Sequence, residues 1–304
     1  MEGAALLAPS AWAAHYIQVA AAMLLFGGAL FPFYAGCGGG SPSPRTMGGL
    51  AVVLCLAVAV AVGLKIVDLT GDPASLFDAG ELKGFFLETS FGKTWLLRFA
   101  LSLAAVAVAL GLRPGPGLRS KERARPALIL LLSGLILLSN AGAGHAQALA
   151  GAPYMLTAVA WEGLHLLAAG AWIGGLLPLL VSIGGSKATE TGSIKVLRSF
   201  SFHGLWMVGL LLLGGFATLG VLMGAWQVSV QALSTSLYGD TLIVKHSLIA
   251  AMVVVAAVNR FILLPRLETG RARVSDLRWT IGLECVLAAL VIAAAITLSQ
   301  TPPP

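Results

Sequence analysis

Eight long apolar stretches constrain the fold of this 304-residue chain more than any other feature. Each is near the roughly 20 residues that a helix needs to cross a bilayer. They lie at about 13–34, 47–67, 94–112, 127–144, 157–181, 201–224, 241–264 and 278–299. Lipid forbids unpaired backbone groups, and these stretches are too long for barrel strands. The sequence therefore predicts an all-α polytopic membrane protein, a bundle of eight transmembrane helices forming a single domain over residues 1–304.

The composition agrees with this class and excludes others. Hydrophobic residues make up 58% of the chain and charged residues 11%, whereas a soluble domain carries roughly 25% charged residues. No GxSxG, HExxH, Walker or Rossmann pattern occurs, so we expect no enzyme. The cysteines Cys37, Cys55 and Cys285 show no CxxC spacing and predict neither a disulfide framework nor a zinc ribbon. The chain start lacks a basic segment and a clear cleavage site, so we expect the first span to be retained.

The basic residues predict the orientation. Most of the 19 lysines and arginines lie in four alternating loops, namely Arg45 in the first, residues 112–126, residues 182–200 and residues 265–278. The loops at 145–156 and 225–240 contain no Lys or Arg. Basic residues collect in cytoplasmic loops, so the net charge of +6 does not indicate nucleic-acid binding. We expect both termini to face outside, in the periplasm of a bacterium.

The longest external loop runs from Asp68 to Lys93 and mixes acidic with apolar residues. Such a pattern is typical of a short amphipathic helix lying on the membrane surface. We predict one such helix here, on the outer side.

The fifth span contains a carboxylate and an imidazole, Glu162 and His165. Three residues apart, they share one helix face and are separated by about 4.5 Å along the axis. Ionisable groups at membrane depth usually face a bundle interior or a wet cavity. The residues that follow, from Ala168 to Gly175, are mostly small and allow close helix packing. We predict that this helix is the packed centre of the bundle and the wall of a site near one membrane face.

Imidazole and thioether groups gather on the predicted outer side. Four of the five histidines lie there, and methionines accompany them: His15, His145, His165 and His246, with Met23, Met155, Met223 and Met252. Neutral imidazole binds copper, zinc, iron and haem, and thioether selects Cu(I). We predict a soft-metal site drawn from His145, His165, Glu162, Met155, His246 and His15. The alternative is ordinary interhelical hydrogen bonds for the histidines and gap filling for the methionines.

A second polar set lies near the predicted cytoplasmic side. Arg260 and Glu284 fall at similar depth in the last two spans, with Asn259 and His203 near the same level. We expect Arg260 and Glu284 to form a buried pair that fixes helix register, or a site where an ion leaves.

At these residues the chain resembles the CopD family of bacterial copper-resistance membrane proteins. The resemblance is carried by AMLLFGGALF, by GHAQALAG with EGLHLLAAGAWIGGLLPL, by YGDTLIVKHSLIAAMVVVAAVNRFILLPRL, and by the last span with its proline-rich end. It implies movement of copper, as Cu(I) or Cu(II), across the bacterial inner membrane, usually inward. A periplasmic CopC-like copper-binding protein is the implied donor, membrane lipid is a partner and nucleic acid is not.

The resemblance carries over to His145, His165, Trp172, Gly174, Gly175, Asn259, Arg260 and Glu284. His246 and His203 depart from the family pattern. Two other functions remain open from the residues alone. One is a b-type haem protein with His165 and either His246 or His145 as axial ligands. The other is an accessory subunit that binds copper within a larger complex without transporting it.

Overall fold

The computed structural model describes residues 2–35, 42–111, 119–141, 154–185, 189–226, 231 and 234–301. Over these ranges the chain is helical and contains no strand. The long helices are α1 (Glu2–Tyr34), α2 (Pro44–Thr70), α4 (Ser90–Gly111), α5 (Arg119–Ala141), α6 (Met155–Gly184), α7 (Glu190–Trp226), α9 (Leu237–Val258) and α11 (Val274–Gln300). Helix α9 continues through η5 (Asn259–Leu263) and α10 (Leu264–Glu268). These ranges contain eight candidate membrane spans, which confirms the predicted helical bundle.

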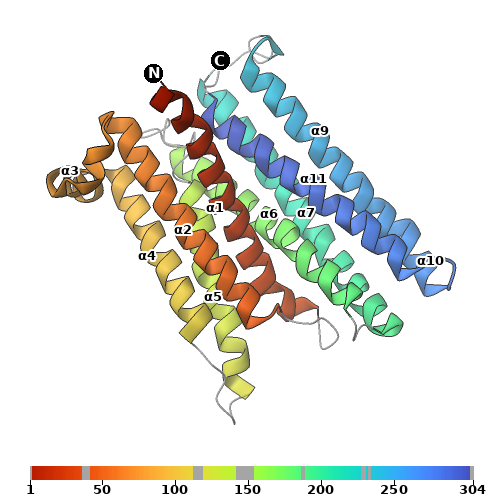
Figure 1. Cartoon of the computed structure of the whole chain (residues 1–304). Helices are drawn as coiled ribbons and strands as arrows, with labels where there is room; N and C mark the ends of the chain where they lie inside the picture. The colour runs from red at the N-terminus through yellow and green to blue at the C-terminus, as the bar shows by residue number, and fades with distance from the viewer. Residues whose placement is uncertain are drawn as a thin grey trace.

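The helices form two groups joined by α6 (Figure 1). Helices α1, α2, α4 and α5 pack against one another on one side, and α9 packs against α11 on the other. Helix α6 contacts α1 and α5 in the first group and α7 and α11 in the second. The two chain ends lie at the same end of the bundle, and α10 and the start of α5 lie at the opposite end (Figure 1). The turn between α10 and α11 lies at that opposite end. The membrane side that each end faces stays a prediction.

Close backbone contact fixes α6 at the centre, as predicted. The run from Ala168 to Leu176 is buried without interruption. A Cβ on Gly174 would overlap the carbonyl of Met23 and lie 3.0 Å from the Cα of Gly27 in α1. A Cβ on Gly175 would lie 2.8 Å from the Tyr34 hydroxyl. Both glycines therefore act in packing, because only a residue without a side chain allows α1 and α6 to approach this closely.

The segment after α2 contains helical turns, but they do not form the single amphipathic helix expected. It consists of η2 (Pro73–Phe77), α3 (Ala79–Lys83) and η3 (Gly84–Glu88). Asp78 interrupts the helix because its Oδ1 accepts hydrogen bonds from the backbone N–H groups of Gly80 and Glu81, at 2.7 and 3.0 Å, and so caps a new helix. Leu82 and Phe85 pack against the core while Phe77 is 90% exposed.

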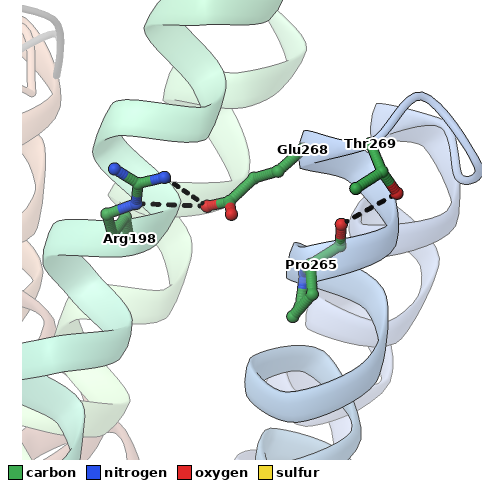
Figure 2. Close-up of polar contacts among 4 residues, drawn as sticks. All are labelled: Arg198, Pro265, Glu268 and Thr269. Carbon is green, nitrogen blue, oxygen red and sulfur yellow. Dashed lines mark hydrogen bonds and ion pairs between the residues drawn. The ribbon is translucent and has the colours of Figure 1, made fainter.

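An exposed ion pair joins α7 to α10 at the end opposite the termini (Figure 2). Arg198 donates from Nε and Nη2 to Glu268 Oε1, at 3.1 and 2.7 Å. In the neighbouring turn the Thr269 hydroxyl donates to the Pro265 carbonyl at 3.2 Å. The ion pair connects the first turns of α7 with the end of the α9–α10 span. Cys55 and Cys285 are free thiols, and Cys37 lies outside the described residues.

Candidate functional site

A cavity of about 500 Å³ opens within the half of the bundle that carries the chain ends, and we call it the wide cavity. All eight long helices contribute to its lining. Most of the wall is apolar, and the ionisable side chains on it are His15, Lys65, Arg98, Glu162, His165, Tyr238, Lys245 and His246. A cavity with a mainly apolar wall and a few convergent polar groups is the usual form of a ligand site.

His165 is held in one orientation by α7. Its Nδ1 lies 2.8 Å from the carbonyl oxygen of Leu211. Since a carbonyl can only accept, Nδ1 carries a proton, and in the neutral ring Nε2 keeps its lone pair, as in metal-binding histidines. Gly214 and Gly215 of α7 make room for it, because a Cβ on either would lie 3.1 Å from an atom of the His165 side chain. Sequence reasoning found His165 but missed this glycine pair. Two consecutive glycines inside an apolar span could have indicated it.

Glu162 lies one turn before His165 and lines the same cavity. Lys245 of α9 also lines the cavity and attracts the Glu162 carboxylate electrostatically. Sequence reasoning did not assign Lys245 to the site. The lysine and the carboxylate attract each other from α9 and α6, although the described structure forms no ion pair between them.

Some of the other candidate ligands line the wide cavity and others do not. His15, His246, Met23 and Met252 line the wide cavity. The His246 Nδ1 lies 2.7 Å from the Leu242 carbonyl, which leaves its Nε2 lone pair available too.

Among the described residues, the predicted ligand Met155 does not line the cavity, and the expected cluster is not formed. Met155 begins α6 and does not contribute to the cavity wall. His145 and the Met223 side chain lie outside the described part of the chain. Within the described ranges, no three His, Cys, Asp or Glu side chains come together as a metal-binding group. The metal site built on His145 and His165 therefore stays a prediction.

Arg98 is a cavity residue that sequence reasoning missed. It lies in α4, is 1% exposed and lines the wide cavity. Its Nε donates to Ser139 Oγ and its Nη2 to the Ser139 carbonyl, each at 3.0 Å, which ties α4 to α5. Its guanidinium lies 4.5 Å from the ring centre of Trp95. Its position as a single arginine inside an apolar span could have indicated a buried functional residue.

A second cavity of about 180 Å³, the narrow cavity, lies nearer the opposite end, among α6, α7, α11 and the continuous run α9, η5 and α10. The Asn259 amide donates to Glu284 Oε1, and the Thr280 hydroxyl donates to Asn259 Oδ1, both at 2.5 Å. Arg260 donates to the Ser201 hydroxyl at 2.9 Å and to the Ser201 carbonyl.

The prediction that Arg260 pairs with Glu284 is therefore wrong. Asn259 and Arg260 are consecutive on the π-helical turn η5, so they point in different directions. Asn259 faces α11 and takes the carboxylate, and Arg260 faces α7. No ion pair joins Arg260 to Glu284 in this described region.

Trp172 is common to the walls of the two cavities. It is 2% exposed and lines both of them. It follows His165 by two turns on α6, so one helix carries a candidate ligand and the residue shared by the cavities. His203 lines neither; its Nδ1 lies 2.9 Å from the Ser199 carbonyl and its ring packs on Tyr34.

Comparison with known proteins places the chain in a family. Residues 6–156 match the family description "Copper resistance protein D-like, N-terminal domain", and residues 194–298 match "Copper resistance protein D". Inner membrane protein YebZ of Escherichia coli (strain K12) is 31% identical over 219 residues, 71% of this chain and 70% of that protein. The chain belongs to the copper resistance protein D family.

Two further relatives bear copper in their names. Copper resistance protein D of Pseudomonas syringae pv. tomato is 26% identical over 297 residues, 92% of this chain and 93% of that protein. Copper transport protein CutJ of Bacillus subtilis (strain 168) is 28% identical over 236 residues, 77% of this chain but only 41% of that protein. No solved structure matches.

The two matched ranges of this copper resistance protein D family member correspond to the two helix groups. The first range ends as α6 begins, and the second starts within the first turns of α7. Helix α6, with Glu162, His165 and Trp172, lies between them and contacts both groups. The candidate ligand and the residue shared by the two cavities are thus carried by the helix that joins the two halves.

Proposed function

We propose that this protein moves copper ions across the bacterial inner membrane, most simply inward. The ion enters the wide cavity from the end that carries the chain termini, passes Trp172 and leaves through the narrow cavity. Family membership supports copper as the cargo. The arrangement of two cavities on either side of one buried side chain supports passage rather than storage.

The observation that carries this proposal is the state of His165. Its Nδ1 is engaged by Leu211, so Nε2 is the free ligand atom, and Met23, Met252 and Glu162 line the same cavity. Imidazole with thioether is a donor set that favours Cu(I) over hard cations. His15 and His246 add two more imidazoles to the wall. In this proposal His145 and Met155 receive copper first, from a CopC-like periplasmic donor.

The narrow cavity provides the exit. Glu284 is 3% exposed and presents the carboxylate of that cavity, with Asn259 bonded to one of its oxygens. A buried carboxylate attracts a cation that has left the soft ligands above. Asn259 and Thr280 hold the carboxylate in place, and Arg260 is held apart on Ser201.

The test is copper uptake into proteoliposomes that contain the purified protein. His165→Ala is expected to reduce uptake at least tenfold, because it removes the fixed imidazole from the wide cavity. His203→Ala is the matched control: it deletes an imidazole bonded to a backbone carbonyl, outside both cavities. Normal uptake by a well-folded His165→Ala protein would refute this assignment. Copper binding without flux in the unmodified protein would instead favour the accessory-subunit role.

One observation favours a second candidate, a b-type haem protein. The wide cavity, at about 500 Å³, exceeds the needs of a single ion, and His165 and His246 both line it. Both have Nδ1 bonded to a backbone carbonyl, the state in which Nε2 ligates haem iron. The visible absorption spectrum of the purified protein decides between the two. A Soret band supports haem, and a colourless sample rejects it.

A further inference from the structure

Arg98 is a buried cation that has hydrogen bonds but lacks a counter-ion among the described side chains. Ser139 accepts from Nε and Nη2, and the Trp95 ring lies beneath the guanidinium. Neither partner carries negative charge. The two ion pairs among the described residues are elsewhere, Lys65 with Asp68 and Arg198 with Glu268.

Few acidic residues outside the described side chains could act as that counter-ion. The stretches that the structure does not describe contain no Asp or Glu. Two acidic residues have side chains outside the description, Glu2 and Glu122. Glu2 begins α1, about 20 Å along that helix from His15, and Glu122 is in the first turn of α5, at the other end from Ser139. Glu162, on the cavity wall, is attracted by Lys245 and forms no ion pair with Arg98 in the described structure.

Arginine cannot relieve such burial by losing its proton. Buried charges in proteins are paired, and at membrane depth an unpaired one marks a functional site. The charge of Arg98 therefore calls for an anion from outside the chain. The cavity that Arg98 lines is the place from which such an anion can approach it.

A second donor supports the same conclusion. Trp95 lines the wide cavity and is 8% exposed, and its indole Nε1 has no acceptor within the described structure. An indole N–H can only donate, as can a guanidinium. Trp95 thus presents an N–H without an acceptor and Arg98 a charge without a counter-ion, both on α4 and on the wall of one cavity. A ligand that only accepts and carries negative charge, such as a carboxylate or phosphate, meets both needs.

The rest of the wall defines the remainder of the ligand. Beyond the polar groups the cavity is lined by apolar side chains, among them Val19, Met23, Val291 and Ile292 of α1 and α11. Its volume is that of an organic molecule rather than a small inorganic anion. We propose that the wide cavity binds an amphiphilic organic anion, whose carboxylate or phosphate group contacts Arg98 and Trp95 and whose apolar body lies along α1 and α11. This proposal does not rest on copper transport.

The test uses the full-length protein, purified and stripped of lipid in detergent, with thermal unfolding as the measurement. The probes are oleate, a dioleoyl phosphatidylglycerol, oleyl alcohol and acetate. Oleate or phosphatidylglycerol is expected to raise the melting temperature, and whichever acts at lower concentration distinguishes a fatty acid from a phospholipid. Equal stabilisation by uncharged oleyl alcohol, or by acetate alone, would overturn the proposal, as would no response to either anion.

Variants locate the site. Arg98→Gln is expected to weaken binding of the active anion at least about tenfold, the loss expected for a charge-assisted hydrogen bond. Lys93→Gln is the matched control, since it removes one positive charge from an exposed position on the same helix and should leave the affinity unchanged. If Arg98→Gln does not fold, Trp95→Phe keeps the ring beneath Arg98, removes only the indole N–H and should weaken binding several-fold. Equal losses in Lys93→Gln and Arg98→Gln would show a general charge effect and refute the site.

Discussion

The wide and narrow cavities differ in how their polar groups are satisfied. In the narrow cavity the polar groups hold one another: Glu284, Asn259 and Thr280 form a chain of hydrogen bonds, and Arg260 is bonded to Ser201. In the wide cavity the Trp95 indole N–H and the Thr218 hydroxyl have no partner within the described structure. Buried polar groups without partners are rare and call for an explanation. The contrast indicates that the narrow cavity is pre-organised by the protein itself and that the wide cavity is completed by what it binds.

The largest expected effect comes from removing the Trp172 side chain, which lines both cavities. Trp172→Ala should join them into one space and lower the free energy of unfolding by about 3–5 kcal/mol, as for other buried aromatic truncations. In proteoliposomes it should also raise passive copper leakage. Trp172→Phe keeps a ring in place and should retain a low leak. An alanine variant that remains as tight as the unmodified protein would show that Trp172 does not separate two connected spaces.

The next effect concerns the helix contact on which both cavities depend. Gly174→Ala introduces a Cβ into the backbone of α1, and overpacking of this kind costs about 1–3 kcal/mol or more. Gly49→Ala in α2 is the comparison, since a Cβ there meets nothing within 4 Å. Melting temperatures in detergent should fall for the first and hold for the second. Equal melting temperatures would show that α1 and α6 tolerate separation.

Glu284 tests whether the narrow cavity is structural. Glu284→Ala leaves the Asn259 amide without its acceptor, which costs about 1–3 kcal/mol. Glu284→Gln retains an oxygen for Asn259 and should keep the melting temperature while slowing copper flux, because the charge that attracts the ion is gone. If the glutamine variant transports copper at the normal rate, Glu284 serves packing alone.

The smallest expected effect is at the exposed ion pair between α7 and α10 shown in Figure 2. The Arg198 side chain is 69% exposed, and solvent-exposed pairs contribute about 0–1 kcal/mol. Arg198→Ala should therefore change the melting temperature little and leave flux intact. A large loss of flux would indicate that movement of α10 relative to α7 belongs to the transport cycle.

The spans were predictable because a helix that crosses a bilayer needs roughly 20 apolar residues. A run of that length can be recognised in the sequence without knowing how the helices pack. The central role of α6 was also predictable, since Glu162 and His165 share a face within one helix. Contacts between distant helices were not. The bond between Arg98 and Ser139 joins residues 41 positions apart, and periodicity along one helix contains no information on such a pair. Glu284 was placed at the right depth and given the wrong partner, because depth does not fix the direction of a side chain on a π-helical turn.

The way in which α7 holds the His165 side chain has one more consequence. Leu211 holds one ring nitrogen, and Gly214 and Gly215 leave space for the side chain against α7. The imidazole could carry a metal from one place to another only by breaking its hydrogen bond to Leu211. A copper ion that binds this imidazole must therefore arrive and leave while the ring keeps its orientation. The rate of transfer would then be set by the rate of ligand exchange at the copper ion.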